Sequence, residues 1–159
     1  MPRIFLRHYQ KFLTSKFFEG LMLRNTSFGS YAKKANKAKG NFIENHAVAY
    51  LMRQNYKILA RNYAYRGGEL DIVAQDDDTT VFVEVKSVWN NSQGNPAARV
   101  NFQKQKKIWK TACHFLCTQI RNLDQKSRFD VLSIRVYEHP LKFEHFKNAF
   151  EATQVIPYC

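Results

Sequence analysis

The sequence predicts a mixed α/β domain in which one β-sheet is flanked by α-helices. Apolar residues recur at helical spacing over residues 41–55 and again over residues 102–123. Three strand-like segments lie between these two helices, and a further strand, RFDVLSIRVYE, follows the second helix. Because this order occupies one chain of 159 residues, a single sheet covered by helices is expected.

The first helix is expected to begin at Asn41 and to end near Asn55, with Ala47 and Leu51 on its apolar face. Glu44, three residues after Asn41, has two interpretations. The pair has the form of a capping box, which stabilises a helix start without any catalytic role. The Glu44 carboxylate is also in phase with Leu51, so it is alternatively expected to lean toward the sheet and to join a site there.

The segment GELDIVAQDDDTTVFVEVK contains two strands and the turn that joins them. If residues 76–79 form the turn, Gln75 lies opposite Thr80 and Val73 lies opposite Phe82. Side chains alternate across a strand, so the apolar residues of the other face should anchor both strands; these are Leu70, Ile72, Val83 and Val85.

The same register places Asp71 opposite Glu84 on one face. Opposed residues have Cβ atoms about 4.5–5.5 Å apart, and two carboxylates so close repel each other. A divalent cation removes this repulsion, and Mg²⁺ accepts a few carboxylate oxygens together with water and phosphate. Lys86, on the same face, can hold a phosphate or help to orient and deprotonate a water. The alternative is an exposed polar face on which Glu69 forms an ion pair with Lys86.

The formal net charge of +12 favours a polyanionic partner, either nucleic acid or an anionic membrane surface. The first 40 residues hold nine basic residues and one acid, Glu19, so most of the excess charge lies there. Residues 1–24 have the pattern of a basic amphipathic helix that can contact a membrane or a protein, and residues 25–40 that of a polar linker. An extension of little consequence explains residues 1–24 equally well.

The cysteine content and hydropathy indicate a reducing, cytoplasmic compartment. Three cysteines form no disulfide framework, and no stretch is apolar and long enough to span a bilayer.

Basic and amide side chains gather at the start of the second helix, where Lys104, Gln105, Lys106 and Lys107 follow one another. Their expected role is contact with phosphates, with Lys104 or Gln105 nearest the acids. A solvated helix face explains each of these residues comparably well when it is taken singly.

Asp71 followed by Glu84-Val85-Lys86 resembles the signature of the PD-(D/E)XK nuclease superfamily. Over residues 40–150 the chain also resembles the YraN family of endonuclease-like bacterial proteins, themselves similar to archaeal Holliday junction resolvases. The resemblance is carried by residues 68–73, 82–86, 104–107, 128–131 and 148–150, with Glu44, Ala47, Tyr50 and Leu51 in the first helix.

The resemblance implies a restriction-endonuclease-like core, a metal-dependent site and a nucleic-acid substrate. Mg²⁺ or Mn²⁺ is the expected metal, with Asp71 and Glu84 as its ligands. Lys86 is expected to position the attacking water, and Glu44 to assist. The domain boundaries implied are an N-terminal extension and linker at 1–39, the nuclease-like domain at 40–150 and a tail at 151–159.

Three hypotheses about function follow. The first is a Mg²⁺-dependent nuclease acting on DNA, with branched and single-stranded DNA as the substrates considered; resolution of a junction would need a homodimer. The second is a non-catalytic nucleic-acid-binding protein that retains the nuclease fold. The third is a protein that binds a membrane or a protein partner through residues 1–24.

Overall fold

The computed structural model describes residues 27–89 and 100–151. The elements of these ranges are α3 (Ser27–Arg53), β1 (Lys57–Tyr65), β2 (Gly68–Asp76), β3 (Thr79–Val88), α4 (Phe102–Phe115), β4 (Ser127–Arg135) and β5 (Lys142–Phe150). The chain divides into two units, Met1–Lys39 and Gly40–Cys159. All five strands, α4 and the part of α3 from Gly40 onward belong to the second unit.

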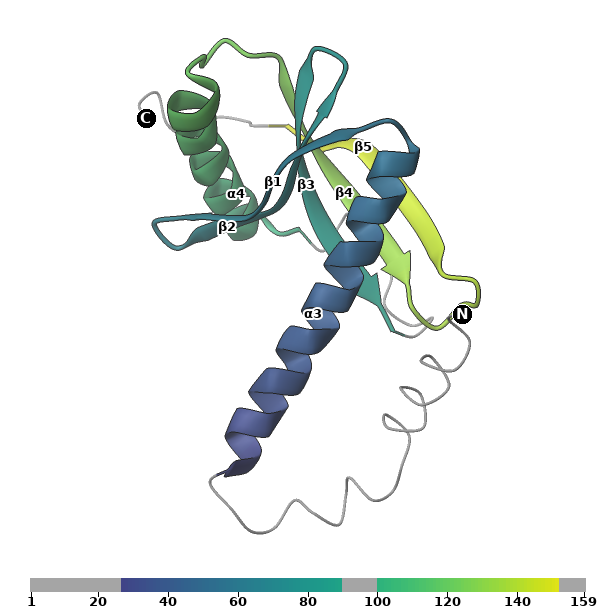
Figure 1. Cartoon of the computed structure of the whole chain (residues 1–159). Helices are drawn as coiled ribbons and strands as arrows, with labels where there is room; N and C mark the ends of the chain where they lie inside the picture. The colour runs from purple at the N-terminus through teal and green to yellow at the C-terminus, as the bar shows by residue number, and fades with distance from the viewer. Residues whose placement is uncertain (1–26, 90–99, 152–159) are drawn as a thin grey trace. The chain divides into compact units, whose positions relative to one another are not determined.

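The five strands form one mixed sheet in the order β1-β2-β3-β4-β5 (Figure 1). β1, β2 and β3 pair antiparallel in sequence, whereas β3 and β4 pair parallel through the crossover that contains α4. β5 then pairs antiparallel with β4. This α/β arrangement is that of a restriction-endonuclease-like core, as the sequence predicts.

Two hydrophobic clusters lie on the two faces of this sheet. Leu51 of α3 packs in one cluster with Ile72 and Val83. Ile108 of α4 packs in the other with Phe82. Alternate residues of β3 therefore face opposite helices, as the two-residue period of a strand requires.

The prediction that Asn41 caps the first helix is wrong, because α3 begins at Ser27 and continues through Asn41. The segment expected as a linker is therefore helical from Ser27 onward. Its alanines and lysines favour a helix, and this preference outweighs the Gly and Asn residues that suggested a break. Glu44 consequently lies inside a helix and does not form a capping box at its start.

The hairpin register is confirmed, but its turn is shorter than expected. Gln75 pairs with Thr80 and Val73 with Phe82, as the sequence predicts. Asp76 and Thr79 also pair, so only the two residues between them turn the chain.

The two strands of this hairpin separate before they reach the acids. The pairing of β2 with β3 extends as far as Ile72 and Val83, while β2 continues to pair with β1 as far as Gly68. Ile72, Val83 and Val85 pack on the α3 side as predicted, but Leu70 packs in the cluster of α4. The prediction for Leu70 is wrong because β2 has left β3 at that point and packs against α4.

Two further elements differ from the sequence-based expectation. Residues 142–150, for which the sequence predicted no strand, form β5, which pairs with β4 along most of its length. The long helix changes at Leu116 from an α-helix to a π-helix, Leu116–Ile120, and ends at Arg121 with a left-handed backbone. The prediction for residues 1–24 lies outside the described residues, as does that for the tail at 151–159 apart from residue 151.

A network of hydrogen bonds and ion pairs connects the strands at the end of the sheet where β4 begins. Arg128 donates to Asp130 at 3.1 Å, to Asp76 at 2.7 Å and to the Tyr56 hydroxyl at 2.9 Å. His145 Nε2 lies 2.9 Å from the second oxygen of Asp130, which is fully buried. Arg128, Asp76 and Asp130 therefore link β4 to β2, to β5 and to the residue that precedes β1.

Hydrogen bonds keep this buried carboxylate charged. Burial raises the pKa of Asp130, but hydrogen bonds from His145, from the Asn148 amide and from Arg128 outweigh it and hold the pKa below its usual range. No helix of the described residues combines the length and the apolar character that crossing a membrane requires.

Candidate functional site

Asp71 and Glu84 come together where β2 separates from β3. Asp71 Oδ2 accepts a hydrogen bond of 2.8 Å from the backbone amide of Val85. The carboxylate of Asp71 thus bonds to the β3 backbone just beyond the last paired residues, Ile72 and Val83. This hydrogen bond holds Asp71 close enough to Glu84 for the two carboxylates to interact.

Two lysines surround the carboxylate of Glu84, which is only 5% exposed. Lys86 Nζ donates to Glu84 Oε1 at 2.7 Å. Lys104 Nζ, from the first turn of α4, lies 3.3 Å from Oε2. Glu84 is therefore a buried acid between two cations that come from different elements, and the ammonium groups offset much of the cost of burying its charge.

The acid beside it has an unusual protonation equilibrium. Burial raises the pKa of Asp71 to about 7, and the negative charge of Glu84 acts in the same direction. The Val85 amide and the two lysine ammonium groups oppose this effect without cancelling it. Asp71 and Glu84 thus interact electrostatically, as two closely spaced carboxylates must.

The donor atoms of this pair fit a hard divalent cation. Glu84 Oε2 is buried and, within residues 27–89 and 100–151, accepts no hydrogen bond. An oxygen left in this state at the end of a buried carboxylate is a natural cation ligand. The same ranges contain no group of three or more His, Cys, Asp or Glu side chains arranged for a metal. A cation here would therefore need backbone, water or phosphate oxygens in addition to the two acids, which is the coordination that Mg²⁺ favours.

Glu44 leans toward the sheet, on the β1 side of the acids. Its Oε2 accepts a hydrogen bond of 2.9 Å from Asn62 and lies 3.7 Å from Arg61. Because Arg61 pairs with Ile72, the register of β1 and β2 places Asn62 opposite Asp71. Glu44 is thus linked to the strand beside Asp71 through Asn62.

Of the basic and amide residues that begin α4, only Lys104 contacts Glu84. Gln105 donates instead to the Val100 carbonyl at 2.8 Å and holds the chain that enters the helix. The Lys106 ammonium lies 4.4 Å from the centre of the Phe102 ring. Lys107 is exposed and lines a groove between α4 and the turn that joins β1 to β2.

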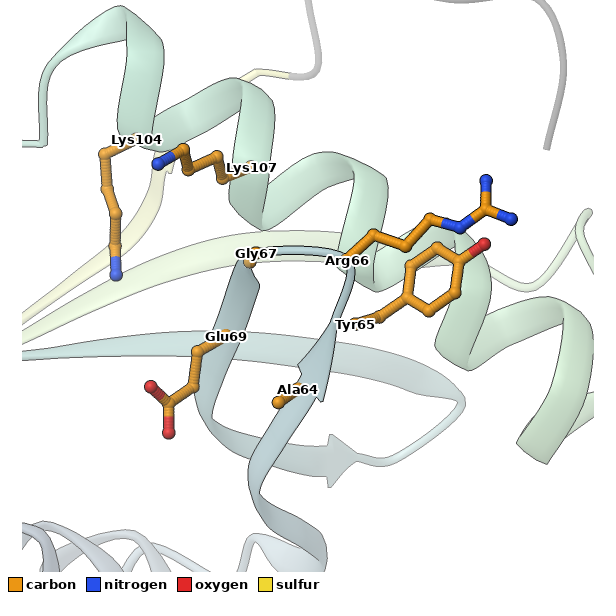
Figure 2. Close-up of a pocket in the computed structure, with 8 residues that line it drawn as sticks. Ala64, Tyr65, Arg66, Gly67, Glu69, Lys104 and Lys107 are labelled. Atoms are coloured by element: carbon orange, nitrogen blue, oxygen red, sulfur yellow. The ribbon is translucent and has the colours of Figure 1, made fainter.

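The ion pair of Glu69 with Lys86, which was the alternative interpretation of this face, does not form. Lys86 donates to Glu84, and β2 is no longer beside β3 at Glu69. Glu69 is exposed and lines the same groove as Lys107 (Figure 2).

The chain is similar in sequence to a family of bacterial proteins. The profile of the family described as "Uncharacterised protein family UPF0102" matches residues 43–134. A UPF0102 protein of Geobacter metallireducens is 48% identical over 116 residues, which cover 73% of this chain and 94% of that protein. The chain belongs to the UPF0102 family. This is the YraN family that the sequence resembles.

Other UPF0102 proteins match over the same part of the chain. A protein of Clostridioides difficile is 41% identical over 115 residues, covering 72% of this chain and 98% of its own length. One of Treponema pallidum is 40% identical over 121 residues, covering 74% and 96%. The residues matched by the UPF0102 profile include Glu44, Asp71, Glu84, Lys86 and the start of α4.

Several residues near these acids are not apparent from sequence patterns. Asn62 and Arg61 contact Glu44, and Arg66 lines the groove beside α4. Arg61 and Asn62 lie in β1, and Arg66 follows it. The alternation of polar and apolar residues along β1 does not distinguish these three from other exposed polar residues. A positive φ of 50° at Asn62 and of 42° at Arg66 marks both positions in the structure, but not in the sequence.

Proposed function

We propose that this UPF0102 protein hydrolyses phosphodiester bonds in DNA, with Asp71 and Glu84 holding Mg²⁺ or Mn²⁺. The observation that carries the proposal is the buried Glu84 carboxylate, which lies beside Asp71, between two lysines, and keeps one oxygen without a hydrogen bond. A structural ion pair would not require a second acid of raised pKa at the same place.

A bound divalent cation would supply Lewis acidity toward the phosphate and lower the pKa of a bound water. The two acids would hold it, and the hydrogen bond from Val85 would fix the orientation of Asp71.

The lysines would act on the water and on the phosphate. Lys86 donates to Glu84 in the present state, so we assign it to orienting the attacking water by donating a hydrogen bond. Lys104 lies within reach of a non-bridging phosphate oxygen when that phosphate is near Glu84, and its charge would offset the charge that develops there. Water attack forms one P–O bond and breaks the bond to the leaving oxygen; the attacking water releases one proton to solvent, and the leaving oxygen takes one up. Glu44 would assist through Asn62, which it orients beside Asp71.

The test is cleavage by the full-length chain of labelled single-stranded, duplex, flapped and four-way DNA, with Mg²⁺ or Mn²⁺. Glu84→Gln and Asp71→Asn should each lower the rate by roughly 100-fold or more, since each removes a charge that acts directly on the reaction. Asp78→Asn is the matched control, because Asp78 is an exposed acid of the hairpin turn. The proposal fails if no substrate is cleaved with either metal, or if Glu84→Gln cleaves as well as the unchanged protein.

Two outcomes would favour the alternatives. Binding of DNA without cleavage, and with no Mn²⁺ bound in titration, would indicate a nucleic-acid-binding protein that keeps the fold. Cleavage of four-way DNA by a species that sediments as twice the chain mass would support a homodimer. A cytoplasmic site of action is part of the proposal, on the basis of the cysteine content. Contact of residues 1–24 with a membrane or protein is a separate proposal, to be tested by sedimentation with liposomes.

A further inference from the structure

A groove runs between α4 and the turn that joins β1 to β2, and adjoins the acids. Its volume is about 510 Å³, and it is lined by residues 64–69 together with Lys104 and Lys107. We call it the turn–helix groove. Lys104 belongs to both places, because its ammonium lies 3.3 Å from Glu84 while its side chain lines the groove. A molecule bound at Glu84 can therefore extend directly into the groove.

The wall of the groove is held in place by close packing. A Cβ atom added to Gly68 would come within 2.7 Å of the Lys107 carbonyl oxygen and would collide with the Thr111 hydroxyl. Thr111 in turn donates to that carbonyl at 2.8 Å. Only glycine allows the turn to lie so near the helix, so the two walls keep their spacing.

The charge of the groove is positive. Arg66, Lys104 and Lys107 line it, and Glu69 is its single acid. In Figure 2, Lys104 and Glu69 lie on one side of the turn and Arg66 on the other, with Lys107 between Lys104 and the turn. Three cations so arranged match the phosphates of a polynucleotide backbone.

The far end of the groove carries an aromatic platform. The Tyr65 ring stacks on His114, with ring centres 3.6 Å apart and planes 11° from parallel. The Arg66 guanidinium lies 5.3 Å from the centre of the same Tyr65 ring (Figure 2). Aromatic rings and arginine planes are the groups on which unpaired bases stack.

We propose that the turn–helix groove binds a single-stranded DNA segment adjoining the phosphodiester held at Glu84, and this inference rests on the proposed function. Lys107 and the edge of the Arg66 guanidinium contact its phosphates, and a base stacks on the face of that guanidinium, which is supported by the Tyr65 ring. A continuous duplex keeps its bases paired in the helix interior, so it offers the groove phosphates but no base. A single strand, or an unpaired arm of branched DNA, offers both.

The test is binding of the full-length chain to a fluorescent oligothymidylate and to a blunt duplex of equal length, in EDTA so that no DNA is cut. The double variant Arg66→Gln/Lys107→Gln should bind the oligothymidylate at least tenfold more weakly. The slope of log affinity against log salt should also become shallower, by roughly 0.7 for each phosphate of the single strand that the variant no longer neutralises. Duplex binding should weaken by a smaller factor, because the duplex loses only phosphate contacts whereas the oligothymidylate also loses the guanidinium on which a base stacks. Glu69→Gln should strengthen oligothymidylate binding, because it removes the acid from the groove.

Lys110→Gln is the matched control, since Lys110 is an exposed lysine of the same helix that does not line the groove. It should change either affinity less than twofold. An equal weakening of oligothymidylate and duplex binding, or unchanged oligothymidylate binding by the double variant, would overturn the inference.

Kinetics separate this inference from the proposed function. With a single-stranded substrate, the double variant should raise KM and leave kcat within threefold, whereas Glu84→Gln should lower kcat. Cleavage that depends on Glu84 but not on the groove residues would reject the groove alone. Cleavage that is unaffected by Glu84→Gln would reject the proposed function, and the binding data would then decide on the groove independently.

Discussion

Glu84 is the residue around which the other charges of the candidate site are arranged. It comes from β3, while the cations that surround it come from β3 and from α4. The Lys104 ammonium lies beside the oxygen of Glu84 that has no hydrogen bond, where it can stand in for a metal cation. Binding of a metal at Glu84 should therefore compete with Lys104.

The first prediction concerns this competition. Lys104→Gln should tighten Mn²⁺ binding by about fivefold, because the ion pair of the partly exposed Lys104 with the buried Glu84 contributes roughly 1 kcal/mol and must be broken by the metal. Calorimetric titration with Mn²⁺ measures the change, and Lys110→Gln provides the control. Weaker Mn²⁺ binding by Lys104→Gln would contradict the prediction.

The second prediction concerns the raised pKa of Asp71. Its value of about 7 lies above the ordinary 3.8, so the folded protein retains a proton that the unfolded chain has already released between these two values. The stability associated with this group is thus fully present below pH 4 and is lost as the pH rises through about 7.

In EDTA, Asp71→Asn should therefore become more stable than the unchanged protein as the pH rises, by at least about 1 kcal/mol at pH 8. Urea unfolding from pH 4 to pH 8 measures the difference. A difference between the two proteins that does not vary with pH would show that Asp71 titrates normally.

At the scale of elements, the site depends on the point at which β2 leaves β3 and packs on α4. Gly68 permits β2 to approach α4 closely. Because β2 and β3 are no longer paired at Asp71, its carboxylate can accept a hydrogen bond from the Val85 amide. A different group, centred on Arg128, holds the strands together at the end where β4 begins. For each of these two groups of contacts we predict a change in the free energy of unfolding.

The third prediction compares two neighbouring glycines. Gly68→Ala should lower the free energy of unfolding by about 1–3 kcal/mol, because the added methyl meets the backbone of α4. Gly67→Ala meets no atom within 4 Å, but its φ of 78° is unfavourable for alanine and should cost about 1 kcal/mol. Urea unfolding distinguishes them, and an equal or larger effect at Gly67 would argue against close packing at Gly68.

The fourth prediction concerns the ion network. Arg128→Met should destabilise the fold by about 3 kcal/mol, because it removes one of the partners of the buried Asp130 charge. Lys126→Met is the matched control, since the Lys126–Asp78 pair is exposed and should contribute nothing measurable. A similar destabilisation in both variants would mean that the network is not specifically stabilising.

At the scale of the whole molecule, charge is distributed unequally along the chain. The first 40 residues carry a net charge of +8, and the remaining 119 carry +4. Charge of this kind strengthens attraction to any polyanion without selecting among substrates. Discrimination among DNA substrates should instead come from the side chains near Glu84 and in the turn–helix groove.

The fifth prediction separates these two effects. Substituting Lys33, Lys34 and Lys37 together by Gln should weaken binding to every DNA substrate by a similar factor and flatten the salt dependence. Relative cleavage rates among single-stranded, duplex and branched substrates should not change. A change in substrate preference would assign these lysines a specific contact.

The properties that depend on neighbours along the chain could be predicted from the amino-acid sequence. A turn at residues 76–79 predicted the register of Gln75 with Thr80, and alternation along β2 and β3 placed Ile72 and Val83 in one hydrophobic face. The two-residue period of a strand determines which residues share a face, because successive side chains point to opposite sides of the sheet. Membership of the UPF0102 family follows from the same linear information.

Tertiary packing decided the rest of the site. The separation of β2 from β3, the packing of Leu70 on α4 and the contact of Lys104 with Glu84 each join residues distant in sequence. Alternation describes one strand, but not where its neighbour diverges, and helix periodicity does not tell which lysine reaches an acid. Those contacts exist because the turn before β2 packs tightly on α4, which follows from the shape of the whole domain and not from any local pattern.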